Sequence, residues 1–453
     1  MDAFRYVEQQ FKLAERTSTT LSTSSRSHLY FLFVLFFCYL IFCSFTVIAD
    51  DWDDDWGDEE EESIQLHGFV ELGFGTFLTN NTSKTNSDLS LAEIITRLEI
   101  VHIWNDIDFS AKGDLHADGA VDEYAVSLRE AKAKFSWDTV DIAVGRQILT
   151  WGTGDLLFLN DIFPKDYQSF FAGRDLEYLK ASSDAIKLGY FGNLLNIDFV
   201  WMPEFEPDVY LSGERFSYFS PQAGDIVAAP PKISPRQPSE KISNSEFAIR
   251  VHDNIEGVEW ALYGYRGYWG QPIAIDTNGN PIFPRLNSYG ASIRSSVMGG
   301  VGNAEISYYQ SVDDSSGTNP LVPNDQIRML VGYETELIAK LTLGLQYYIE
   351  HTLDHDELLS NSFFPNYEQD ESRQLITTRL NYRVNRDKLN LSLFAFYSPT
   401  DNDTYLRPAI SYRIDDSWSI VAGANIFTRD EKHTFWGQFD ENDNVYVRLK
   451  FSY

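Results

Sequence analysis

Cysteine is nearly absent from this sequence. Its 453 residues include two cysteines, Cys38 and Cys43, and both fall within the first 49 residues. From Asp50 onward the chain has no thiol that can form a disulfide, ligate zinc, attack a substrate or attach haem through a Cys-x-x-Cys-His motif. All chemistry of these kinds is therefore excluded for the chain after residue 49.

The motifs of common enzyme and cofactor sites are missing as well. The sequence has no Gly-x-Ser-x-Gly, no His-Glu-x-x-His, no glycine-rich phosphate loop and no dinucleotide fingerprint. The best histidine cluster is His351 and His355, four residues apart in a predicted loop, where adventitious binding of a divalent metal is the alternative to plain solvation. We predict no enzymatic activity, no cofactor and no dedicated metal site, and a hydrolase built on the same fold is the less favoured alternative.

Positive charge is scarce. The chain carries 36 Lys and Arg against 67 Asp and Glu, a formal net charge of −31, which disfavours nucleic acid as a partner. Much of the excess lies in the acidic run 50–62, and blocks of like charge usually stay solvated. We predict an acidic disordered tail over residues 50–63, with metal binding by its carboxylates as the alternative.

The sequence has one long apolar run, Leu29 to Ile48, which follows a polar stretch containing Arg16 and Arg26. The run ends at Val47-Ile48-Ala49, where the side chains suit the pocket of a signal peptidase. This pattern predicts a secretory signal peptide over residues 1–49, cleaved after Ala49. An uncleaved membrane anchor is the alternative, because the run approaches the length that spans a bilayer.

What the remaining chain does contain is alternation with a period of two. Between residues 107 and 116 one face is Ile107, Phe109, Ala111, Gly113 and Leu115, and the other is Asp108, Ser110, Lys112, Asp114 and His116. Successive side chains of a strand point to opposite faces, so such a strand separates an apolar environment from a wet one. By this pattern we place strands near 64–77, 91–104, 107–117, 123–137, 139–148, 184–191, 194–203, 245–253, 257–267, 286–298, 302–312, 326–336, 340–351, 373–384, 388–398, 405–413, 418–427 and 443–453.

The connections between these strands alternate in length throughout. Short turns are predicted at Asn105-Asp106, Asp138, Gly192-Asn193, Asn254, Gly299-Gly300, Leu337-Ile338, Asn385-Arg386-Asp387 and Asp415-Asp416. Long connections include 149–183, 204–244, 268–285 and 352–372. A soluble sandwich has no reason to keep this phase, whereas an outer-membrane barrel has short periplasmic turns and long extracellular loops. The sequence therefore predicts an all-β fold, a transmembrane antiparallel β-barrel over residues 64–453 with about 18 strands, in a range of 14–18 because the segments near 184 and 405 are weak.

Aromatic residues make up 15% of the chain, and several stand at the ends of predicted strands. Outer-membrane barrels carry aromatic girdles at the two lipid interfaces, with ordinary core packing as the alternative. The predicted partners are outer-membrane lipid and, through the C-terminal strand that ends at Tyr453, the barrel-assembly machinery. The girdle residues are Trp104, Trp137, Trp201, Tyr397, Trp418 and Tyr453.

Alternation also assigns charged side chains to the lumen, where rings of charge decide what passes. The basic residues assigned inward come mainly from the last third of the chain: Arg294, Arg379, Arg383, Arg407, Arg413, Arg448 and Lys450. The acidic residues come mainly from the first strands: Glu71, Glu99, Asp108, Asp114, Glu130, Glu305 and Glu350. Opposed walls of opposite sign would orient dipolar solutes, and the alternative is that the charges pair across the lumen and keep it wet.

The connection from residue 149 to 183 differs from a solvated outer loop. It mixes glycines, aromatic residues and both signs of charge, which favours a segment folded inward that narrows the pore. The residues of this predicted constriction are Trp151, Gly152, Asp155, Asp161, Lys165, Arg174 and Asp175.

A family resemblance begins just before this connection. The string Gly145-Arg146-Gln147-Ile148-Leu149-Thr150-Trp151-Gly152, followed by Asp161 and Pro164, resembles the Gly-Arg-Gln-x-x-x-Trp-Gly signature of porin-like barrels related to the alginate-export family. The resemblance implies an outer-membrane barrel of about eighteen strands, and some members pass anionic sugars through arginine-lined lumens. The match covers about a twentieth of the chain.

Together these features predict a bacterial outer-membrane channel for passive transport of small polar or anionic solutes, including sugars or polysaccharide fragments. The alternative from another class is a structural or adhesive barrel that does not conduct and works through its long loops.

Overall fold

The computed structural model describes residues 64–78, 87–105 and 107–453. The predicted signal peptide over residues 1–49 and the acidic tail over 50–63 lie outside the described residues. Within the described ranges, no helix has the length and apolar character needed to cross a membrane.

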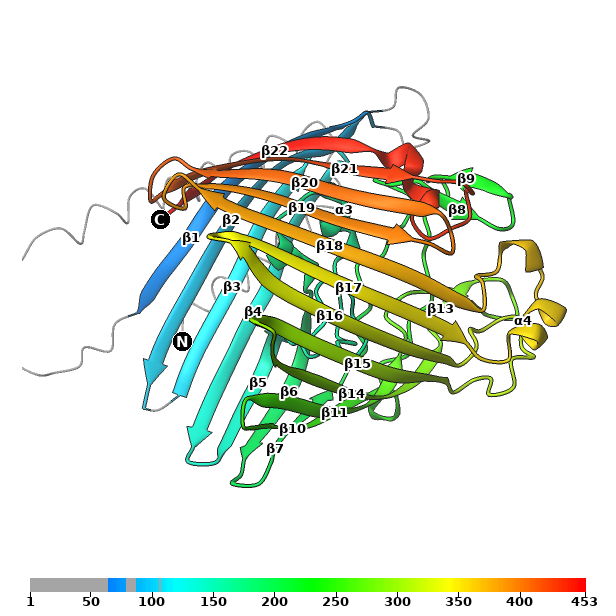
Figure 1. Ribbon diagram of the computed structural model, residues 1–453, viewed down its shortest axis with the longest axis horizontal. Helices are drawn as coiled ribbons and strands as arrows, with labels where there is room; N and C mark the ends of the chain where they lie inside the picture. Colours follow the sequence, from blue (N-terminus) through cyan, green and yellow to red (C-terminus); the bar gives the residue numbers. More distant parts are fainter. Residues whose placement is uncertain (1–63, 79–86, 106) are drawn as a thin grey trace, which may run out of the picture. The chain divides into compact units, whose positions relative to one another are not determined.

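The described chain forms one eighteen-stranded antiparallel sheet (Figure 1). The sheet closes because β1 pairs with both β2 and β22. This confirms the predicted barrel and its strand number, and the weak segments near 184 and 405 are the strands β6 and β20. The strands are β1 (Gln65–Phe77), β2 (Leu89–Trp104), β3 (Ile107–Asp118), β4 (Glu123–Trp137), β5 (Val140–Ile148), β6 (Ser182–Phe191), β7 (Asn196–Met202), β10 (Glu246–Ile255), β11 (Val258–Tyr268), β14 (Arg285–Val297), β15 (Gly300–Ser311), β16 (Gln326–Ile338), β17 (Leu341–Thr352), β18 (Ser372–Val384), β19 (Leu389–Ser398), β20 (Asp403–Arg413), β21 (Trp418–Thr428) and β22 (Asn444–Ser452).

Tight turns join the strands at one end of the barrel, and backbone conformation decides where they fall. Glu256 and Gly257 both have positive φ, at 52° and 83°, which is the geometry of the tightest hairpins. The turn therefore lies there, and the prediction at Asn254 is wrong because Asn254 still pairs within β10. The prediction at Leu337-Ile338 is wrong for the same reason: Lys340 takes the positive φ, at 69°, and both predicted residues belong to β16.

The long connections at the other end carry short elements of their own. Residues 149–181 contain the helix α3 (Tyr167–Ala172) and the 3-10 turn η1 (Leu176–Leu179). The other connections hold β8 (Tyr218–Ser220), β9 (Asp225–Val227), η2 (Ile242–Asn244), β12 (Ala274–Ile275), β13 (Pro281–Ile282), α4 (His355–Asn361), η3 (Pro365–Tyr367) and η4 (Gly437–Asn442).

The two faces of the sheet differ in chemistry as the alternation predicts. On β1, Leu72 and Phe74 stand on the outer face and are 51% and 54% exposed. Glu71 of the same strand stands on the inner face and is 3% exposed. The aromatic residues Trp104, Trp137 and Trp418 are likewise exposed. A soluble protein with an apolar surface of this extent would aggregate, whereas in a membrane the lipid covers that surface.

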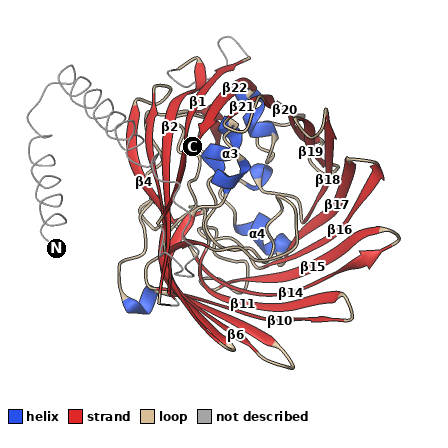
Figure 2. Cartoon of the chain, turned by 90° about the vertical axis from the view of Figure 1, so that its left-hand side faces the viewer, coloured by secondary structure: helices blue, strands red, loops and turns tan. Residues whose placement is uncertain are grey.

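The core lies inside the ring of strands, where Figure 2 shows α3. Phe170 and Phe171 of α3 pack with inward aromatic residues of β19 to β22, among them Phe396 and Tyr405. Phe439 from the connection 429–443 joins the same cluster. The interior is thus filled by the chain's own connections as well as by strand side chains.

Candidate functional site: the barrel interior

The Gly-Arg-Gln motif forms the end of β5, and the chain turns from the barrel wall into the interior just after it. Gly145 has a φ of 119°, and a Cβ atom there would lie 2.2 Å from the carbonyl oxygen of Ala131, so only glycine fits. Trp151 is buried, and its ring lies 5.0 Å from Phe163 and 6.1 Å from Tyr263. Gly152 follows with a φ of 79°. These residues fix the direction in which the connection 149–181 leaves β5.

The polar residues of the motif join neighbouring segments. Arg146 donates two hydrogen bonds to the carboxylate of Glu206, at 2.7 and 2.8 Å, which ties β5 to the connection 203–245. The Nε2 atom of Gln147 donates to the carbonyl oxygen of Ala185 on β6 at 3.1 Å. Both residues therefore hold the start of the inward segment in place.

The first half of the connection is bound to the wall formed by β15 to β18. Glu305 of β15 accepts hydrogen bonds from the backbone N–H of Gly154 at 2.7 Å and from Asn160 Nδ2 at 2.8 Å, and it also accepts from Thr153. Asp155 forms an ion pair with Arg379 of β18 at 2.8 Å. The N–H of Asp155 also donates to Gln346 of β17 at 2.8 Å, so the segment 153–160 contacts β15, β17 and β18.

Helix α3 is bound to a neighbouring part of the wall, formed by β20 and β21. Asp166 caps its N-terminus by accepting from the N–H of Ser169 at 2.8 Å, and Gly173 ends it in the left-handed conformation. Asn425 of β21 donates to the carbonyl oxygen of Phe171 at 2.8 Å, and Arg407 of β20 donates to that of Arg174 at 2.9 Å. The connection therefore passes along the inner wall from β15, β17 and β18 to the strands β20 and β21.

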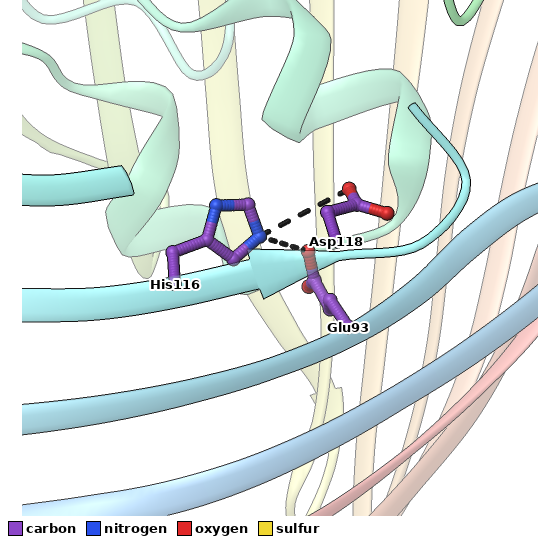
Figure 3. A group of neighbouring side chains, drawn as sticks. All are labelled: Glu93, His116 and Asp118. Atoms are coloured by element: carbon purple, nitrogen blue, oxygen red, sulfur yellow. Dashed lines mark hydrogen bonds and ion pairs between the residues drawn. The ribbon is translucent and has the colours of Figure 1, made fainter. Parts of the chain in front are cut away.

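Glu93, His116 and Asp118 come together on β2 and β3 in the arrangement of a metal site (Figure 3). The guanidinium of Arg174 already lies among them, 2.6 Å from Glu93 and 3.4 Å from Asp118. Arg215 from the connection 203–245 also pairs with Asp118. Burial alone would lower the pKa of Arg174, but Glu93 raises it above the usual value. Two cations thus occupy this site, and it anchors the connections to the wall.

A second buried cluster holds the segment after α3. Arg97 of β2 is 1% exposed; it binds Asp114 through two hydrogen bonds, at 2.6 and 2.8 Å, and Glu177 at 2.5 Å. Arg448 of β22 binds Glu71 at 3.2 Å and lies 3.9 Å from Asp175. Buried charges are stable only when paired in this way, so the clusters fix the connection firmly.

The strand register puts every charged residue assigned to the lumen on the inner face. They fall into two groups. In the first group, Arg379, Arg407 and Glu305 bind the connection 149–181, Arg448 binds Glu71, Asp114 binds Arg97, and Glu350 pairs with Arg328. Nearer the short turns, Glu99 pairs with Lys112 at 3.3 Å, Glu130 pairs with Lys132 at 3.0 Å, and Lys450 lies 3.8 Å from the centre of the Phe69 ring. The exposed members of this group are Arg294, Arg383, Arg413 and Asp108.

The signs on the inner face are interleaved. Lys112, Lys132 and Lys134 stand among the acids of β3 and β4, and Glu334 stands on β16. The expected separation of the two signs onto opposed walls is therefore incomplete. The remaining predicted residues of the constriction, Asp161 and Lys165, form a buried ion pair at 3.0 Å.

The histidine pair has separate partners. His351 Nδ1 lies 2.8 Å from Ser372 Oγ, and His355 Nε2 lies 2.9 Å from the carbonyl oxygen of Gln369. The one group of metal-ligating side chains found among the described residues is the Glu93 cluster.

Sequence reasoning did not find a cavity of about 660 Å3 between the connection 149–181, the other long connections and the inner wall. It also did not single out Arg97, Arg328 and Arg373. The alternation along the strands could have indicated them. Arg373, for example, stands six residues before Arg379 and hence on the same face of the strand. The cavity itself is built from distant segments, so no local pattern marks it.

Comparison with solved structures finds the fold of outer-membrane porins. OccAB4 of Acinetobacter baumannii matches with a TM-score of 0.53 at 11% identity, over 88% of this chain and 99% of that one. A BenF-like porin of Pseudomonas fluorescens matches with a TM-score of 0.52 at 11% identity, over the same shares of the two chains. OccAB3 of A. baumannii matches with a TM-score of 0.51 at 10% identity, over 86% and 99%. No family model and no curated protein sequence matches this chain. The fold is therefore that of a porin-like β-barrel.

Proposed function

We propose that this chain is a passive channel of the bacterial outer membrane for small polar solutes. One observation carries the proposal: eighteen strands close into a ring with an apolar outer face and a polar, charged inner face. The core of a bilayer offers no partners to unpaired backbone groups, so an edgeless sheet can cross it where an open one cannot. The polar inner face then gives water-soluble molecules a path.

The connection 149–181 is the element that narrows this path. It leaves β5 after Ile148, lies against β15 to β18, and returns past β20 to β22 and β1 to β4 before it enters β6. Its ion pairs with Arg379 of β18 and with Glu93 and Arg97 of β2 support a fixed constriction. A mobile lid would not need buried partners such as Arg97.

Both signs of charge on the inner face favour weak ion selectivity. Arg294, Arg383 and Arg413 add positive potential near the short turns, and Asp108 offsets part of it. The resemblance to the alginate-export barrels supports anionic sugars as one class of solute.

The test is reconstitution of the purified chain in planar bilayers. We expect single-channel steps with weak ion selectivity, and a larger conductance after deletion of residues 153–176. Deletion of the exposed hairpin tip 276–280 is the matched control and should leave the conductance unchanged. Absence of conductance in all three proteins would contradict the proposal and favour a non-conducting structural barrel.

A further inference from the structure

The cavity of about 660 Å3 is lined mostly by aromatic and aliphatic side chains. They come from segments far apart in the sequence, including Phe158 in the connection 149–181, Tyr210 in 203–245, Trp269 in 269–284 and Phe435 in 429–443. Pockets of this size and character hold a small organic molecule, with aromatic rings that stack on flat apolar groups. This surface is unlike the charged inner face nearer the short turns.

Each charged group in the cavity wall already has a partner within the protein. Lys165 binds Asp161 at 3.0 Å and the carbonyl oxygen of Phe163 at 2.6 Å. Arg328 pairs with Glu350 at 3.4 Å and lies 4.1 Å from the centre of the Tyr309 ring. A charged solute would have to displace one of these internal partners, because a buried charge without a counter-charge is costly.

The remaining two charged groups show the same balance. Arg373 binds Asp401 at 3.0 Å, and its register partner on β17 is the acid Glu350. Asp208 accepts hydrogen bonds from the N–H of Lys165 and from Gln271, and burial raises its pKa above the usual value. The cavity wall is therefore close to neutral and lacks a free charge of either sign.

Three donor atoms of cavity-lining residues lack a hydrogen-bond partner within the described part of the chain: Trp269 Nε1, Trp436 Nε1 and Arg373 Nη2. Of these, the buried Nη2 atom of Arg373 can donate to one uncharged oxygen, such as a hydroxyl or ether oxygen. A carboxylate at the same place would meet a guanidinium whose charge Asp401 already balances.

We propose that this cavity is a binding site for uncharged solutes that carry an aromatic ring and hydroxyl groups, through which the channel selects among the molecules that it passes. The inference rests on the proposed channel function and names one class of solute that the channel binds. The ring stacks on the aromatic wall, and an uncharged oxygen takes the free donor of Arg373.

Three probes separate the features that this site recognises. Phenyl β-D-glucoside has a ring and no charge, phenyl β-D-glucuronide has the same ring with a carboxylate, and methyl β-D-glucoside has no ring. Trp269 and Trp436 line the cavity, so binding in detergent is measured by quenching of tryptophan fluorescence. Interruption of the single-channel current by each probe is measured separately in planar bilayers.

We expect phenyl glucoside to quench and to interrupt the current at concentrations at which the other two probes have little effect. Phe435→Ala and Tyr210→Ala should each weaken both effects about five-fold, because each removes one aromatic face. Phe363→Ala is the matched control: Phe363 is 61% exposed and lies outside the cavity wall. It should bind the probe as the unchanged protein does.

The outcomes separate the two proposals. Equal or stronger binding of the glucuronide or of methyl glucoside would overturn the inference, and so would wild-type binding by both cavity variants. If the barrel conducts ions but the probes neither quench the fluorescence nor interrupt the current, the channel proposal holds and the binding-site proposal is wrong. Quenching by phenyl glucoside without any conductance would support the binding site and contradict the channel proposal.

Discussion

Glu305 is the wall residue that holds the most groups of the inward connection. Its carboxylate accepts hydrogen bonds from Thr153, Gly154 and Asn160, and it is 4% exposed. A buried N–H that loses its acceptor costs about 1–3 kcal/mol, so the loss of several at once outweighs most single contacts of the segment.

Glu305→Ala should therefore detach the segment 153–160 from β15. We expect the single-channel current to become noisier and larger on average, because the detached segment no longer holds one position. Glu259→Ala removes an exposed inner-face glutamate on β11 and is the control. A quiet current of unchanged size from Glu305→Ala would show that this carboxylate does not hold the constriction.

Asp443 gives a residue-scale dependence on pH. Burial raises its pKa to about 6 from the usual 3.8, while the N–H of Phe427, at 2.6 Å, favours the charged form. The folded connection 429–443 binds this proton more tightly than the unfolded chain does. Its contribution to stability is therefore full below pH 4 and is lost as the pH rises through 6.

The measurement is thermal unfolding followed by tryptophan fluorescence, because Trp436 lies in the same connection. In the unchanged protein, the midpoint temperature of this transition should decrease as the pH rises from 5 to 7.5. Asp443→Asn keeps the neutral form at every pH and should flatten this dependence. Equal slopes in the two proteins would remove Asp443 as the cause.

At the scale of elements, the connection 149–181 depends on the backbone of the motif that precedes it. The motif stands where β5 ends, and its glycines adopt conformations that other residues reach only with strain. Its side chains then fix the neighbouring segments. The motif thus has a structural role: it directs the connection 149–181 into the barrel. This role explains the residue types of the motif without any contact with a solute.

Gly145→Ala tests this role. A Cβ atom 2.2 Å from the oxygen of Ala131 forces the two strands apart, so we expect a clear loss of refolded barrel, seen as a smaller heat-modifiable band on a gel. Gly113→Ala is the matched control, since its nearest neighbouring atom is 3.8 Å away and its φ is not positive. Equal refolding of both variants would contradict the structural role of Gly145.

Elements of the wall were predictable and the path of the inward connection was not, for a physical reason. A strand at a lipid surface must alternate apolar and polar side chains, so the inward positions of Arg407 and Arg448 follow from this alternation alone. Their partners, the carbonyl oxygen of Arg174 and the carboxylate of Glu71, depend on how distant segments pack. Composition favoured an inward segment over 149–183, but no local pattern gives its contacts.

At the scale of the whole molecule, one sheet separates two environments. Lipid on the outside stabilises side chains such as Leu72 and Phe74, which would be unfavourable in water. Water on the inside stabilises the exposed charges Arg383 and Asp108. The cavity formed by the long connections is a third environment, apolar and close to neutral, and it lies within the same ring of strands.

Cysteine accessibility is the most direct test of this separation, because the chain from Asp50 onward contains no cysteine of its own. Ser392 and Leu393 are adjacent on β19 and face opposite sides, Ser392 opposite Asn381 and Leu393 opposite Leu380. A water-soluble methanethiosulfonate reagent should react with Ser392→Cys and lower the single-channel conductance, and it should leave Leu393→Cys unchanged. Equal reaction at both positions, or reaction at Leu393→Cys alone, would contradict a barrel with a wet interior and a lipid-covered outer face.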